Sequence, residues 1–277
     1  MTEYCYTMDD LLYLMDRLRD PDNGCPWDLH QTEASLVNYS IEEVYELADA
    51  IESGNSQDIC GELGDVLFQV VFFARLAAER GDFQFTDIIH GLCQKLVLRH
   101  PHVFPDGELR SDPPLPREAV AMRQVADNWE AIKLSERAAR QRTGLFADVP
   151  LALPASLRAA KLQKRATAVG MDWPSVGGAL ACLESEICEL HDELSTPIID
   201  RQRLEAELGD IFFSCVNVAR KLDINPEQAL RGANQRFVAR VTAACQLAEN
   251  DNITLADTDE TARETYWQRA KAIAADG

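Results

Sequence analysis

The stretch GELGDVLFQVVFFAR at residues 61–75 returns as AELGDIFFSCVNVAR at residues 206–220. A second match follows each copy, with QKLVLR at 94–99 and QRFVAR at 235–240. The same order at similar spacing indicates an internal duplication, so the chain is expected to hold two copies of one structural unit. In both copies the ELGD acids lead directly into an apolar run that is typical of a buried helix.

A second acidic step precedes each ELGD motif. Its members are Glu43 and Glu46 in the first half, and Glu186 and Glu189 in the second. These acids are spaced symmetrically with the ELGD acids about Gly54 and Ile198, which lie in turn-like segments. If each pair of helices folds back at its turn, acids three residues apart share one face and the carboxylates converge. The predicted clusters comprise Glu43, Glu46, Glu62 and Asp65, and Glu186, Glu189, Glu207 and Asp210.

Four carboxylates packed together repel one another unless a cation lies between them. Oxygen-only ligands favour Mg²⁺, with Mn²⁺ as a possible substitute, whereas zinc usually recruits His or Cys. A di-iron bundle would need Glu three residues before His, and this chain has no such step. Because carboxylate-held magnesium commonly serves phosphoryl chemistry, hydrolysis of a phosphoanhydride by a metal-activated water is the expected reaction. The alternative is that these acids lie on an ordinary solvent-exposed helix face. The acidic pattern occurs twice, each time beside an apolar run, and this argues against an exposed face.

Composition sets the outer limits. The 277 residues include 46 acidic and 27 basic ones, for a formal net charge of −19, which disfavours nucleic acid as a partner. Eight scattered cysteines without CxxC spacing indicate free thiols in a reducing compartment. The start of the sequence lacks the features of a secretory signal, and no apolar run is long enough to cross a membrane. The expectation is a cytoplasmic protein without membrane contact.

Helical periodicity runs through nearly the whole chain, and strand-like alternation is almost absent. The expected fold is all-α, a tandem repeat of two small four-helix-type bundles. Proline-rich breaks lead to three predicted segments: an N-terminal helical domain at 1–115, a helical linker at 116–154 and a C-terminal helical domain at 155–277. The expected helices cover about 8–18, 36–51, 59–78, 88–98, 117–140, 157–169, 176–194, 201–222, 227–248 and 262–274.

The two acidic motifs, the duplication, and the CPWD and RHPHVF segments together resemble the MazG group of all-α nucleoside triphosphate pyrophosphohydrolases. The resemblance covers nearly the whole chain. It implies an all-helical fold, Mg²⁺ held by the four acids, and hydrolysis of NTPs and dNTPs to a monophosphate and pyrophosphate, with broad base tolerance and a role in nucleotide-pool housekeeping. The sequence departs from the family's acidic motif at one position, because Ser185 stands where the first half has Glu42.

The second half is the favoured catalytic unit. Its acidic helix continues with polar Asn217 where the first half has Phe72, and the segment before it is basic. Cations beyond the metal are needed to hold a triphosphate. The candidate substrate contacts read from the sequence are Lys161, Lys164, Arg165 and Asn217, and those implied by the resemblance are Arg203, Arg236, Arg240 and Trp267.

Other readings stay open. Small helical units of this kind often complete their core with a second chain, so an intertwined homodimer is expected, with the first half as a possible dimerisation or regulatory module. A narrower pyrophosphohydrolase, of the dUTP or phosphoribosyl-ATP type, is the nearest enzymatic alternative. A regulatory interaction protein with a degenerate N-terminal site is the alternative outside enzymes.

Overall fold

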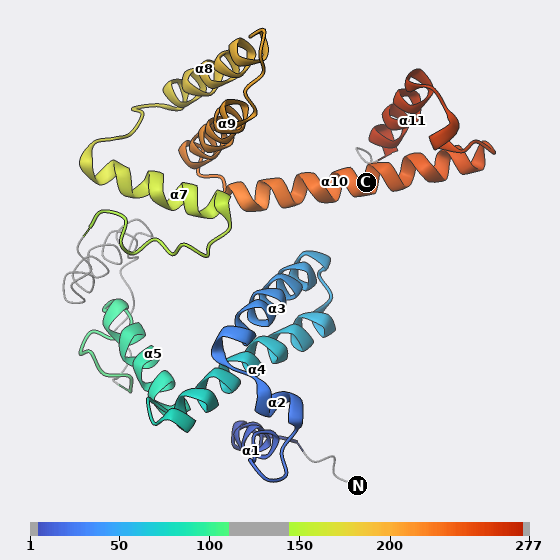
Figure 1. Ribbon diagram of the computed structural model, residues 1–277. Helices are drawn as coiled ribbons and strands as arrows, with labels where there is room; N and C mark the ends of the chain where they lie inside the picture. The colour runs from blue at the N-terminus through green and yellow to red at the C-terminus, as the bar shows by residue number, and fades with distance from the viewer. Residues whose placement is uncertain (1–4, 111–143, 274–277) are drawn as a thin grey trace. The chain divides into compact units, whose positions relative to one another are not determined.

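The computed structural model describes residues 5–110 and 144–273, and every regular element in these ranges is a helix (Figure 1). The chain divides into two compact units between residues 133 and 134, a point that lies outside the described ranges. An all-α fold with two helical units is therefore confirmed. None of the helices in the described part is long and apolar enough to cross a membrane.

The first unit is built around a helical hairpin. Its elements are α1 (Met8–Leu18), α2 (Pro26–His30), α3 (Glu33–Ser53), α4 (Ser56–Arg80) and α5 (Phe85–Arg99). Helices α3 and α4 pack against each other, and α1 and α5 pack on α4. Gly54 ends α3 with a left-handed φ of 75°, and Asn55 caps α4 by accepting a hydrogen bond from the Gln57 amide at 3.0 Å. Because glycine adopts this φ without strain, the chain reverses within two residues and the hairpin is tight.

The second unit repeats this hairpin. Its elements are α7 (Ala155–Ala166), η1 (Thr167–Val169), α8 (Val176–Leu194), α9 (Arg201–Lys221), α10 (Pro226–Asn250), η2 (Leu255–Asp257) and α11 (Glu260–Ile273). Helices α8 and α9 form the hairpin, α7 packs on α9, and α11 packs beside the far part of α10 (Figure 1). Ser175 and Asp200 cap α8 and α9 with side-chain oxygens, which fixes where each helix begins.

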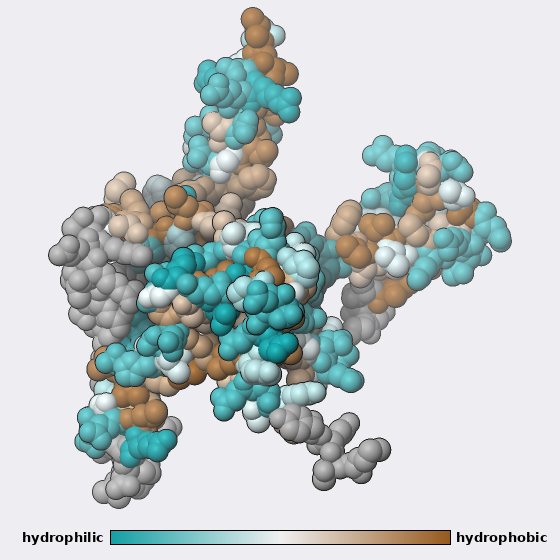
Figure 2. All heavy atoms as spheres, turned by 60° about the horizontal axis from the view of Figure 1, so that its bottom comes forward, coloured by the Kyte–Doolittle hydropathy of each residue, from teal (hydrophilic) through white to brown (hydrophobic). Residues whose placement is uncertain are grey.

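Hydrophobic side chains are divided between small cores and the surface. Figure 2 shows hydrophobic residues at the molecular surface, and large apolar side chains such as Phe212 and Val238 are each 63% exposed. In the second unit, a buried cluster joins α10 to α11 through Ala244, Ala248, Tyr266 and Ala270. Many large apolar side chains of the described chain therefore lie at its surface rather than in these cores.

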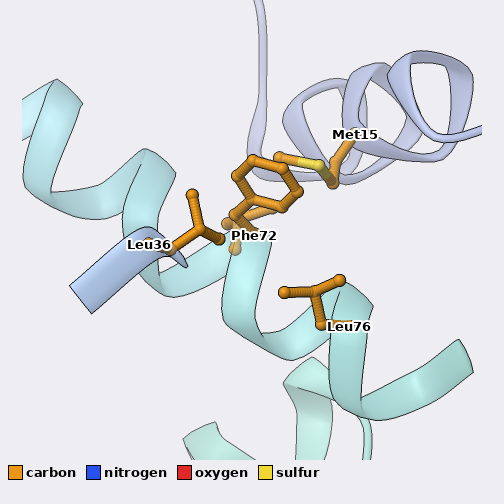
Figure 3. Close-up of a cluster of buried hydrophobic side chains, with 5 residues drawn as sticks. Met15, Leu36, Phe72 and Leu76 are labelled. Carbon is orange, nitrogen blue, oxygen red and sulfur yellow. The ribbon is translucent and has the colours of Figure 1, made fainter. Parts of the chain in front are cut away.

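The core of the first unit gathers at one end of the hairpin (Figure 3). Phe72 is completely buried, and Met15 and Leu36 are each 1% exposed beside it. Arg19 covers this core: its guanidinium lies 5.5 Å from the Phe72 ring centre and forms two hydrogen bonds of 2.7 Å to the Glu79 carboxylate. The guanidinium also donates to the Asp28 carbonyl, which ties α2 to α1.

The predicted helices agree closely with the structure. Helices α1 and α8 begin and end at the predicted residues, and the other described ones differ by at most three residues at either end. The short α2 was not predicted, because its five residues are too few for a helical period to show. The expected helix at 117–140 lies outside the described residues. The domain bounds 1–115, 116–154 and 155–277 stay predictions.

Candidate metal centre

The α8–α9 hairpin brings acids from two helices to one place. Oxygens of Glu186, Glu207 and Asp210 all lie within 4.8 Å of one another. Glu189, one turn after Glu186, is close enough for its charge to act on Glu207. The hairpin thus brings three of the four predicted acids together, and Glu189 lies outside this closest group.

The first unit holds a matching cluster. Oxygens of Glu43, Glu62 and Asp65 lie within 4.8 Å of one another, with Glu46 close enough to affect Glu62. Glu62 Oε2 is buried and has no hydrogen-bond partner. Burying a carboxylate oxygen without a hydrogen-bond partner costs free energy, and a bound cation or a proton would offset this cost.

The electrostatic state of both clusters reflects this crowding. Burial, followed by the charges of Glu189, Asp210 and Glu186, raises the pKa of Glu207 above its ordinary value. In the first unit, burial and the neighbouring acids raise the pKa of Glu43 and of Glu62 in the same way. In each cluster the ionised form is disfavoured by desolvation and by like charges, both of which a divalent cation would offset.

The donor set suits a hard cation. All the converging atoms are carboxylate oxygens, the ligands that Mg²⁺ and Mn²⁺ accept in proteins. Cys182 Sγ donates to Glu186 Oε1 at 3.6 Å and contacts Ser214 Oγ at 3.7 Å. It thus supports an acid rather than joining the oxygen cluster, and the residues present fit a magnesium-type site.

The surroundings of the two clusters differ in ways that the sequence did not reveal. Ser185, which replaces the outer acid of the first half, donates a 3.3 Å hydrogen bond to Glu189 Oε1 and so orients that carboxylate. In the first unit, Gln69 forms a hydrogen bond with Glu43 and itself accepts one from Ser40 at 3.3 Å. Cys182 was not predicted, because a single cysteine on a helix carries no signal of its own.

The predicted substrate contacts of α7 and α9 fall into two groups. Lys161 and Lys164 are exposed on α7. Among the remaining ones, Arg165 forms an ion pair of 2.6 Å with Asp148, Arg203 pairs with Glu193, and Asn217 accepts a 2.7 Å hydrogen bond from Arg220. Arg203 is still 64% exposed, so its guanidinium is accessible to a ligand at the turn end of the hairpin.

The remaining predicted contacts lie on the α10–α11 pair. Trp267 packs beside Phe237, with ring centres 5.9 Å apart, and the Arg240 guanidinium lies 5.9 Å from the Trp267 ring. Arg240 Nε is buried and has no hydrogen-bond partner, whereas Arg236 is exposed on the same helix. The described contacts of Trp267 are thus with α10 rather than with the acids of the α8–α9 hairpin.

Comparisons with known proteins agree with the fold and the acid clusters described above. Residues 31–104, which include the first acid cluster, match the model of the MazG nucleotide pyrophosphohydrolase domain. The chain is 40% identical to a nucleoside triphosphate pyrophosphohydrolase of Escherichia coli (strain K12) over 95% of this chain and 97% of that protein. It is 38% identical to the nucleoside triphosphate pyrophosphohydrolase/pyrophosphatase MazG of Thermotoga maritima, over 98% of both chains. With relatives this similar over nearly their full length, the chain belongs to the MazG family of nucleotide pyrophosphohydrolases.

Proposed function

We propose that this protein hydrolyses nucleoside triphosphates and deoxynucleoside triphosphates to a nucleoside monophosphate and pyrophosphate, with Mg²⁺ as its cofactor and Mn²⁺ as a substitute. The observation that carries the proposal is the cluster of converging carboxylate oxygens, built twice from the same ELGD motif. The names of the full-length relatives support the same activity. Broad base tolerance follows if the metal and the cations bind the phosphates that all these substrates share.

The acids of the second unit are the proposed catalytic set. Bound to Glu186, Glu189, Glu207 and Asp210, Mg²⁺ would neutralise phosphate oxygens and lower the pKa of a water molecule. Glu189 lies beside the three closest acids and is held by Ser185, so we assign it the orientation of the attacking water. Glu43, Glu46, Glu62 and Asp65 would hold a second metal ion, and the matching cluster of Glu43, Glu62 and Asp65 supports this assignment.

Cations on the second unit would hold the triphosphate and the departing pyrophosphate. Lys161 and Lys164 lie on α7, and Arg203 lies at the turn end of α9, near the acids. Arg165, Asn217, Arg236, Arg240 and Trp267 complete the proposed set of substrate contacts. Since phosphate contacts are shorter and stronger with charged donors, this set explains how a chain with a net charge of −19 can bind a polyanion.

A homodimer is the proposed assembly. Three apolar residues spaced by seven line an exposed face of α3, and the corresponding residues of the duplicated unit line α8: Val37, Val44 and Ile51, and Leu180, Ile187 and Leu194. All six side chains are at least 40% exposed. Seven-residue spacing is typical of a face that packs against another helix, and a second copy of the chain would cover it.

The assembly can be tested on the full chain by sedimentation velocity. Leu180→Lys and Val37→Lys each place a charge in one of these faces, and the wild-type chain is expected to sediment as a dimer. At least one of the variants should shift to the monomer. A wild-type chain that is monomeric at all concentrations would refute the proposed assembly.

Product analysis tests the activity most directly. The purified protein is incubated with Mg²⁺ and ATP or each dNTP, and the products are separated by ion-exchange chromatography. Monophosphate and pyrophosphate in equal amounts are expected. Diphosphate with orthophosphate would contradict the proposed bond cleavage, turnover of dUTP alone would favour the narrower enzyme, and no turnover would favour an interaction protein. The net charge of −19 supports a protein that does not bind nucleic acid, and the free cysteines support a cytoplasmic location.

A further inference from the structure

Beside the acid cluster of the second unit, a short chain of hydrogen bonds crosses the α8–α9 hairpin. Cys182 Sγ donates to Glu186 Oε1 at 3.6 Å and lies 3.7 Å from Ser214 Oγ. A thiol has a single proton, and Cys182 uses it on Glu186, so the Ser214 hydroxyl donates to the sulfur. The chain therefore runs from Ser214 on α9, through the thiol, to a carboxylate of the cluster on α8.

Ser214 faces the cluster rather than solvent. The residue is only 6% exposed, and its hydroxyl contacts the Cys182 sulfur. It follows Asp210 by four residues, so both residues lie on the same face of α9. A buried hydroxyl needs a hydrogen-bond partner, and the sulfur supplies it.

The first unit has a different side chain at the same position, directed at the corresponding acid. Gln69 corresponds to Ser214 in the repeated stretch and is 9% exposed, and it forms a hydrogen bond with Glu43, the counterpart of Glu186. Its Oε1 accepts from the Ser40 hydroxyl at 3.3 Å, which leaves its Nε2 to donate to the carboxylate. Each unit thus uses a buried polar residue of its ELGD helix to support the same acid.

The two units differ in how the support reaches the acid. A glutamine amide extends further from the backbone than a serine hydroxyl, so Gln69 contacts its acid directly. Ser214 is shorter, and the Cys182 thiol spans the remaining distance to Glu186. In the first unit the residue four positions before the acid is Tyr39, whose ring packs on α2. The thiol therefore occurs in the unit where the buried polar residue is short.

We infer that Cys182 and Ser214 are positioning residues for the metal of the second unit, which fix the Glu186 carboxylate so that it faces the cation. Partners that hydrogen-bond a metal ligand orient it, and their loss typically lowers metal affinity by about 10–100-fold. Because a thiol is a weak donor, the loss expected here is at the lower end of this range. The inference rests on the proposed function, since it takes the acids to be the metal ligands.

Mn²⁺ binding to the full-length chain tests this inference in the absence of substrate. Free Mn²⁺ is measured by electron paramagnetic resonance in a parent variant, Glu62→Gln, which weakens the first cluster so that the second dominates the titration. In this parent, Cys182→Ala should lower Mn²⁺ affinity about tenfold, and Ser214→Ala should lower it in the same direction. Cys188→Ala makes the same substitution at an exposed thiol of α8 and is the matched control, with an affinity expected within about twofold of the parent.

A rescue variant separates positioning from a packing role. Adding Ser214→Gln to Cys182→Ala copies the first unit, where the amide contacts the acid directly, and removal of the sulfur makes room for the longer side chain. This double substitution should restore Mn²⁺ affinity to within about threefold of the parent. Unchanged affinity in Cys182→Ala would overturn the inference, as would a loss that Ser214→Gln fails to restore in a chain with the circular dichroism of the parent. Ser214→Ala decides the test if Cys182→Ala does not fold, and unchanged affinity there would also overturn the inference.

These outcomes are distinguishable from failure of the proposed function. A chain whose Mn²⁺ affinity depends on Cys182 but whose wild type hydrolyses no triphosphate would refute the proposed function and not the positioning role. Triphosphate hydrolysis together with a Mn²⁺ affinity that neither alanine substitution changes would refute the positioning role alone. A wild-type chain that binds no Mn²⁺ would refute both.

Discussion

Replacing Glu207 with Gln removes one negative charge from the second acid cluster at nearly constant size. Glu207 is one of three acids whose oxygens lie within 4.8 Å of one another, so the variant loses a ligand oxygen for the metal and places an amide N–H₂ near the cation. Removal of one such electrostatic contact commonly lowers kcat by about 10²–10³-fold, and we expect a loss of this size. The helical fold should persist, since repulsion from Glu189, Asp210 and Glu186 is relieved.

Two measurements follow this variant. Initial rates of ATP hydrolysis with saturating Mg²⁺ give the loss in kcat. Thermal unfolding followed by circular dichroism, with and without Mg²⁺, separates catalysis from folding: without metal the variant should unfold at a higher temperature than the wild type, and Mg²⁺ should raise its unfolding temperature less.

Glu62→Gln is the matched variant in the first unit, because Glu62 occupies the same place in its own cluster. It should also raise the unfolding temperature without metal but lower kcat by less than about tenfold, which is small beside the loss expected for a direct catalytic contact. Full activity in Glu207→Gln together with a large loss in Glu62→Gln would refute the placement of the chemistry in the second unit.

Three further predictions concern stability and the support of the site. Without metal, the free energy of unfolding should fall as pH rises above the ordinary carboxyl range. The reason is that Glu43, Glu62 and Glu207 have a raised pKa, so the folded state holds their protons more tightly than the unfolded state. Denaturant titrations should show that Mg²⁺ removes this pH dependence, and a metal-free stability that does not change with pH would contradict the prediction. Phe72→Ala should destabilise the first unit by about 3–5 kcal/mol in the same titrations, since the ring is fully buried, and a change below about 1 kcal/mol would show that the core collapses around the gap. Ser185→Ala removes the hydrogen bond to Glu189 and should lower kcat by about tenfold with little change in stability, whereas unchanged kcat would show that Glu189 does not depend on Ser185.

Much of the acid site could be read from the sequence because it depends on local geometry. Acids three residues apart share a helical face whatever surrounds them, and the symmetric spacing about Gly54 fixed which acids meet across the hairpin. The helix bounds were equally predictable, since capping residues such as Ser175 and Asp200 act on the amides that follow them directly.

The partners of the basic residues could not be predicted in this way. Arg165 and Arg203 were read as phosphate contacts, but their ion pairs with Asp148 and Glu193 are made by residues 17 and 10 positions away. Within the basic segment KLQKR, the sequence indicates the two lysines as substrate contacts, whereas the structure shows that Gln163 is the buried residue. Which face of α7 turns inward is set by its packing on α9, which the local sequence does not specify.

The sequence by itself therefore determined the all-helical fold, the duplication and three acids that meet in each hairpin, because helical periodicity and turn position are local properties of the chain. The tertiary structure decided how the surroundings of the acids differ between the two copies. Only the packing of α1 and α7 on their hairpins shows that Phe72 is core in one unit, whereas Asn217 lines a cavity beside the acids in the other. Burial depends on which distant side chains fill the available volume, and that is settled by the folded chain as a whole.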